Sequence, residues 1–82
     1  MHQYLSEYLA LFEVHEKNRK WFEGSYATLV DKYDREFVAV YEERVVDSDK
    51  DLDSLVRRVT AKHPSEMVLI EYVTKEKIQL IL

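Results

Sequence analysis

Residues 36–59, EFVAVYEERVVDSDKDLDSLVRRV, contain a change of hydrophobic period that decides the fold. Apolar side chains first alternate between the two faces of a strand: Phe37, Ala39 and Tyr41 on one face, Val38 and Val40 on the other. Two glutamates and an arginine then precede a second β-branched stretch. We therefore expect a β-hairpin of residues 36–41 with residues 44–47, although its turn lacks the usual Asn-Gly pair.

The second half of this stretch changes to a helical period. Apolar side chains follow the i, i+3, i+4, i+7 spacing of an amphipathic helix: Leu52, Leu55, Val56 and Val59. Basic residues lie toward its end, where they complement the helix dipole. His63-Pro64 stops the helix, because the residue before a proline avoids the helical region. We expect a helix over residues 51–62.

Four aspartates at alternate positions, 47 to 53, raise the question of a calcium site. A helix-loop-helix calcium loop needs a glycine at position 6 and a glutamate at position 12, and counting from Asp47 these positions hold Leu52 and Arg58. The alternative is a helix entrance, in which Asp49 or Asp51 caps the helix and Asp53 lies in its first turn. We favour the helix entrance, with weak divalent binding as the remaining alternative.

Residues 1–33 predict an aromatic helical region. Apolar side chains recur at heptad spacing on both sides of a polar middle: Leu5, Tyr8, Phe12, then Phe22, Tyr26, Leu29 and Tyr33. His15 and Arg19 fill the stripe positions between them. The region is either one bent helix or two helices that meet near Asn18 or at Gly24-Ser25, and we favour a bend or break because short strands cannot cover a rod of about 45 Å.

The C-terminal part predicts two further strands. Residues 67–73 are rich in branched and aromatic side chains and indicate an inner strand, and residues 77–82 indicate a last one. The chain is therefore expected to be a single domain, 1–82, of the α+β class, in which an N-terminal helical region (1–33) precedes a β-β-α-β-β unit (34–82). We expect a small, mostly antiparallel sheet with the helices on one face. The expected core includes Leu55, Val59, Leu69 and Ile70.

Composition excludes several classes of function. The net charge of −4 disfavours direct nucleic-acid binding, no apolar run is long enough for a membrane span, and we expect no signal peptide. With no cysteine, neither disulfides nor thiolate metal sites can support the thin core of an 82-residue chain. The location is expected to be cytoplasmic. The 34% of charged residues and the single glycine also suit a thermophile protein.

No catalytic constellation stands out in the sequence. The three histidines are far apart, Arg19 stands where a zinc-peptidase helix would need its second histidine, and the serines lie in no nucleophile motif. We therefore expect no enzyme, no cofactor, no metal ligands and no catalytic residues.

The aromatic residues of the first third are better candidates for contact than for catalysis. Because they lie on helices of an acidic protein, core packing or subunit contact explains them better than base stacking. Trp21 and Phe22 point in different directions on a helix, so one can face the sheet and leave the other for a partner. The predicted interface consists of Tyr8, Phe12, His15, Arg19, Trp21 and Phe22.

Several short motifs together resemble a known family. These are Trp21-Phe22 with Tyr26, the FVAV strand, the Asp-Leu-Asp helix entrance and the VLIEYV stretch of residues 68–73. Over about residues 18–74 the chain resembles a family of small, mostly archaeal proteins catalogued as a domain of unknown function. The resemblance implies the fold, and it implies no activity and no catalytic residue.

The sequence leads to two hypotheses of function. The first is a non-enzymatic, cytoplasmic protein-interaction module that self-associates as a homodimer through its N-terminal aromatic helical region. The alternative is an antitoxin-like or transcription-associated regulatory partner of a neighbouring gene product.

Overall fold

The computed structural model describes the backbone of residues 2–76 and the side chains of residues 7–76. The order of elements is α1 (His2–Tyr33), β1 (Glu36–Val40), β2 (Val45–Asp49), α2 (Leu52–Lys62), the 3-10 turn η1 (Ser65–Met67) and β3 (Leu69–Val73). The α+β class is confirmed. The expected last strand, residues 77–82, lies outside the described residues.

The three strands form one antiparallel sheet in the order β2-β1-β3. In the central strand, Ala39 lies opposite Asp47 of β2 and Ile70 of β3. Within the described residues β1 is the central strand and β3 (Leu69–Val73) pairs with it on one side, whereas the strand expected on the other side of β3, residues 77–82, lies outside the described residues. Because β3 lies at an edge of this sheet, Leu69 and Ile70 are only half-buried, while Leu55 and Val59 are buried as predicted.

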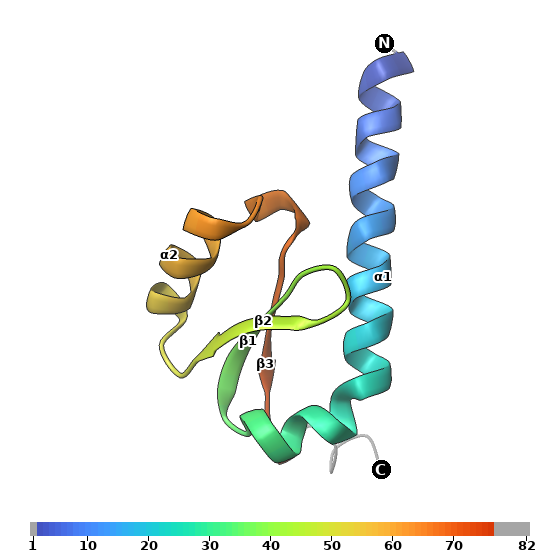
Figure 1. Ribbon diagram of the computed structural model, residues 1–82. Helices are drawn as coiled ribbons and strands as arrows, with labels where there is room; N and C mark the ends of the chain where they lie inside the picture. The colour runs from blue at the N-terminus through green and yellow to red at the C-terminus, as the bar shows by residue number, and fades with distance from the viewer. Residues whose placement is uncertain (1, 77–82) are drawn as a thin grey trace.

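The two helices cover opposite faces of the sheet, so the prediction that both lie on one face was wrong. On the face toward α1, the buried core joins two parts: Phe22, Tyr26, Leu29 and Val30 from the helix, with Val38, Val40 and Val73 from the sheet. On the other face, Leu55 and Val59 of α2 pack against Ala39 and Val68. Figure 1 shows the sheet between the helices. The reason is the alternation in β1, where apolar side chains on both faces each need a cover.

Helix α1 is continuous over 32 residues, so the alternative of two helices was wrong. Gly24 does not break it: the residue is exposed, and a Cβ there would meet no atom within 4 Å. Figure 1 shows that the blue and cyan part of α1 is straight and that its last turns, in green, curve toward the sheet. The expected bend is thus present without a break, and the molecule is 45 Å long.

The β1–β2 turn is tight although neither of its central residues is glycine or asparagine. The backbone N–H of Tyr41 donates to the carbonyl of Arg44 at 2.9 Å, and Glu42 and Glu43 between them have φ angles of 52° and 58°. Positive φ at both central residues is characteristic of a type I′ turn, which matches the twist of the paired strands. The prediction of a hairpin is therefore confirmed. Its turn places two glutamates in the left-handed region of the backbone.

Candidate functional site

The N-terminal part of α1 extends beyond the end of the sheet. Among the side chains described from residue 7 on, Asn18 makes the first polar contact of α1 with the rest of the molecule, and Val14 one turn earlier lines a hollow next to Met67. From His2 to Val14 the helix rises about 18 Å at 1.5 Å per residue. We call residues 2–13 the α1 overhang. In Figure 1 it is the blue part that stands clear of the strands.

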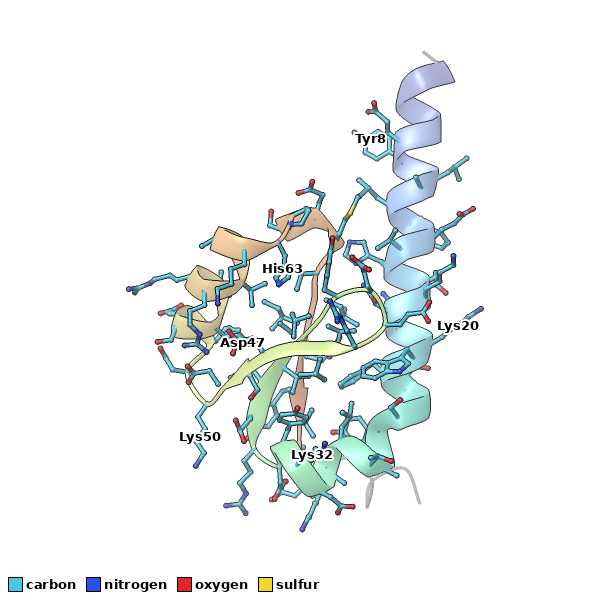
Figure 2. All side chains as sticks on the ribbon, viewed as in Figure 1. Tyr8, Lys20, Lys32, Asp47, Lys50 and His63 are labelled. Carbon is cyan, nitrogen blue, oxygen red and sulfur yellow. The ribbon has the colours of Figure 1, made fainter. Side chains whose placement is uncertain are left out.

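Three large apolar side chains of the α1 overhang are exposed to solvent. The exposed fractions are 69% for Tyr8, 54% for Leu9 and 63% for Phe12. Tyr8 and Phe12 are one helical turn apart and lie on the same side of the helix. We call these three residues the apolar stripe. Figure 2 shows Tyr8 beyond the end of the sheet. A cluster of this kind on an otherwise charged surface is typical of a contact with another molecule.

The other four predicted interface residues lie closer to the sheet. His15 is half-buried, and Arg19 is exposed, with its Nη1 3.5 Å from Oε1 of Glu16. Trp21 is half-buried against the α1-side core. Phe22 is only 4% exposed, so it is not available on the surface and its assignment to an interface needs correction. The reason is that Phe22 is the side chain of the Trp21-Phe22 pair that faces the sheet.

Asn18 anchors α1 to two other segments, a role that was not predicted from the sequence. The side chain is 1% exposed. Its Nδ2 donates to the carbonyl of Met67 at 3.2 Å, and its Oδ1 accepts from the N–H of Glu43 at 3.0 Å. Both ends of the amide are thus bonded, as a buried polar group requires. In the sequence, the indication of this role was the position of Asn18, four residues before Phe22 and therefore on the same side of the helix as that buried ring.

A second anchor, Tyr26, holds the C-terminal half of α1. The hydroxyl of Tyr26 donates to the carbonyl of Thr74 at 3.0 Å and accepts from the N–H of the same residue at 3.0 Å. The ring of Tyr26 also meets Phe22 edge-on, with centroids 5.3 Å apart. Together with Asn18, these contacts hold α1 rigidly on the sheet, so the α1 overhang projects in a defined direction.

The aspartate run forms a helix entrance and a clamp for Arg58. Asp51 is the N-cap of α2, and its carboxylate accepts from the backbone N–H and the hydroxyl of Ser54. Arg58 donates to both carboxylate oxygens of Asp47, at 2.9 and 3.1 Å, and to Asp49 at 2.8 Å. Figure 2 shows Asp47 on the side of β2 toward α2. The predicted helix entrance is confirmed, and the clamp that joins β2 to α2 was missed.

These contacts change the acidity of both strand carboxyls. The hydrogen bond from Arg58 lowers the pKa of Asp47 below its ordinary value. For Asp49 the largest cause of the lowered pKa is the hydrogen bond from the backbone N–H of Asp51, followed by that from Arg58. The carboxylates in turn raise the pKa of Arg58. The guanidinium therefore occupies the place between the two aspartates that a cation would take.

Three other features bear on function: metal-binding clusters, membrane-spanning helices and surface hollows. Among the side chains of residues 7–76, no three His, Asp or Glu groups lie close enough to hold a metal ion. Between residues 2 and 76, no helix is both long and apolar enough to cross a membrane. A hollow of about 360 Å³ lies between α1 and the hairpin turn, lined by Val14, Lys17, Glu42 and Met67 among others. Asn18, which also borders it, already uses both ends of its amide.

Residues 2–76 define a small α+β protein in which two helices enclose a three-stranded antiparallel sheet and the first helix carries an exposed apolar stripe. The chain belongs to the family of unknown function DUF5678, whose model matches residues 28–76, more than half of its length. Comparison with curated proteins and with solved structures finds no match. The matched residues include the sheet, α2 and the end of α1, whereas all six predicted interface residues precede them.

Proposed function

We propose that this protein is a non-enzymatic, cytoplasmic interaction module that self-associates through α1. The observation that carries the proposal is the apolar stripe, in which three large side chains are more than half exposed on a helix that extends beyond its own core. Exposing apolar surface to water costs about 25 cal/mol of free energy per Å². Burial against a second molecule removes that cost.

The rest of α1 supports the same proposal. The bonds of Asn18 and Tyr26 fix the helix on the sheet, so little conformational entropy is lost when the α1 overhang binds. Trp21, half-buried at the margin of the core, can extend the contact toward the sheet. Large aromatic side chains dominate the binding energy of protein interfaces when a partner excludes water from them.

Sedimentation equilibrium tests this proposal. At about 100 µM, well above a modest dissociation constant of about 10 µM, we expect the wild-type protein to be dimeric. The Phe12→Asp variant should be mostly monomeric, because its carboxylate would have to be desolvated in the interface.

Ala10→Asp provides the matched control. Ala10 is exposed on another side of the same helix, and the substitution changes the net charge by the same amount. We expect Ala10→Asp to remain dimeric. A wild-type protein that stays monomeric at this concentration, or equal effects of the two variants, would rule out self-association through the stripe.

The exposed side of α2 favours the alternative function, a regulatory partner of a neighbouring gene product. Leu52 and Val56, one helical turn apart on α2, are also exposed, and they lie within the family-matched residues, outside the α1 overhang. Such a surface could receive a different protein while α1 holds two copies together. Co-expression with the adjacent gene product, comparing wild type with Val56→Lys, tests it: co-purification that Val56→Lys abolishes supports the alternative.

A further inference from the structure

Charge is distributed unevenly along α1, and this sets a direction for the contact between two copies. Residues 2–13 contain two acidic residues, Glu7 and Glu13, and no lysine or arginine. Residues 15–20 contain three lysine or arginine residues, Lys17, Arg19 and Lys20, and one acidic residue, Glu16. The α1 overhang is therefore the acidic half of the exposed helix, and the turns that follow it are the basic half.

We propose that two copies pair through antiparallel α1 helices, with the axis of symmetry close to Phe12; this inference rests on the proposed self-association. A parallel pair would place each acidic half beside the other acidic half, within the range of about 10 Å over which charges interact at moderate salt. An antiparallel pair places the acidic half of one copy along the basic half of the other. It also opposes the two helix dipoles, which is favourable.

The position of the stripe around the helix leaves room for such a partner. At 100° per residue, Phe12 lies about 120° around α1 from the buried Asn18, and Tyr8 lies about 80° from it. The stripe thus faces to one side of the sheet, so a second helix can lie against it without displacing the contacts of Asn18 with Met67 and Glu43. The two sheets then lie toward opposite ends of the helix pair.

The antiparallel register also explains why a polar residue, His15, stands at a heptad position where an apolar side chain is expected. With Phe12 near the axis, residues 8 and 9 of one copy lie level with residues 15 and 16 of the other, and Glu7 lies level with Lys17. Tyr8 then packs beside His15, whose ring nitrogens remain available to the Tyr8 hydroxyl. A polar side chain at a stripe position is a known way of selecting one helix register over others.

Disulfide trapping tests the direction of pairing, because the 82-residue chain contains no cysteine of its own. The probes are Leu9→Cys and Glu16→Cys, which leave Tyr8 and Phe12 in place. In the antiparallel pair, a residue at 9 is about 9 Å along the axis from its own copy and a residue at 16 about 12 Å, whereas a disulfide needs Cα atoms within about 7 Å. Each variant alone should therefore stay uncrosslinked under mild oxidation, and an equimolar mixture should form the mixed disulfide.

Arg57→Cys, at an exposed position on α2, reports random collision and should not crosslink with either probe. Efficient crosslinking of each variant with itself would overturn the antiparallel inference and leave self-association through α1 standing, since it would indicate a parallel pair. A dimer in sedimentation that gives no crosslink in any combination would overturn both, because the stripe would not be the interface. A monomer in sedimentation would also overturn both.

Discussion

Single side chains hold this small protein together at points where its backbone alone would not. Asn18 bonds one end of its amide to the hairpin turn and the other to the segment before β3, so one residue connects three elements. The turn that it contacts is strained, because Glu42 and Glu43 both adopt positive φ. For residues with a Cβ, this conformation costs about 1 to 2 kcal/mol each.

The strain predicts that Glu43→Gly stabilises the protein. Glycine adopts positive φ without a steric penalty, and its backbone N–H can still donate a hydrogen bond to Oδ1 of Asn18. It also increases the conformational entropy of the unfolded chain, which offsets part of the gain. We expect a net gain of about 0.5 to 1 kcal/mol in the free energy of unfolding, measured by urea denaturation. Glu23→Gly removes the same charge in the middle of α1 and should cost about 1 kcal/mol. Loss of stability in Glu43→Gly would show that the glutamate side chain, and not the backbone, governs the turn.

At the scale of elements, α2 is held on the sheet by three different means. Leu55 and Val59 are buried against β1, Asp51 caps its first turn, and Arg58 binds Asp47 and Asp49 of β2. The charged contact is the one that depends on pH. Since the pKa values of both aspartates are lowered in the folded protein, their contribution to stability is present above the ordinary carboxyl pKa of about 4 and is lost as the pH falls below it.

We therefore predict that the difference in stability between wild type and Arg58→Gln shrinks as the pH falls from 7 through the ordinary carboxyl pKa of about 4 and the aspartates of the clamp become protonated. Urea midpoints at a series of pH values measure this difference. The other carboxylates are present in both proteins, so their effects cancel in the difference and the effect of the clamp remains. Arg57→Gln is the matched control: Arg57 is exposed beside Arg58 on the same helix, and its difference from wild type should change little with pH. A constant difference for Arg58→Gln would contradict a role of the clamp in stability.

At the scale of the whole molecule, the protein combines a short sheet with a helix that is longer than the sheet can cover. The sheet has strands of five residues, about 17 Å long, whereas α1 spans 32 residues. The surplus length is the α1 overhang, and the proposed dimer covers it. Folding and association are then coupled, because the second copy binds the folded state and not the unfolded chain.

This coupling predicts a melting temperature that depends on protein concentration. Between about 2 and 200 µM, the wild-type midpoint should rise by at least about 4 °C, the shift that about 1 kcal/mol produces in a domain of this size. The midpoint of Phe12→Asp should stay constant over the same range. A wild-type midpoint that is independent of concentration would contradict an association that stabilises the fold.

The hydrophobic periods of the sequence determined the hairpin, α2 and its capping aspartate. These features depend on neighbours within a few residues: alternation marks β1, the i, i+3, i+4 spacing marks α2, and a short acidic side chain marks its N-cap. The α+β class follows from their order. The family resemblance extends the same information, since its motifs are packing and capping positions.

Only the tertiary structure decided which face of the sheet each helix covers and which side chains stay exposed. Leu52 and Leu55 have the same apolar character in the sequence, yet one is exposed and the other fully buried. Phe12 and Phe22 differ in the same way, because Phe22 faces the sheet and packs in its core, whereas Phe12 lies on the α1 overhang. The bonds of Asn18 join residues 25 and 49 positions apart. Local periodicity carries no information on such distant partners, so they emerge only when the chain packs in three dimensions.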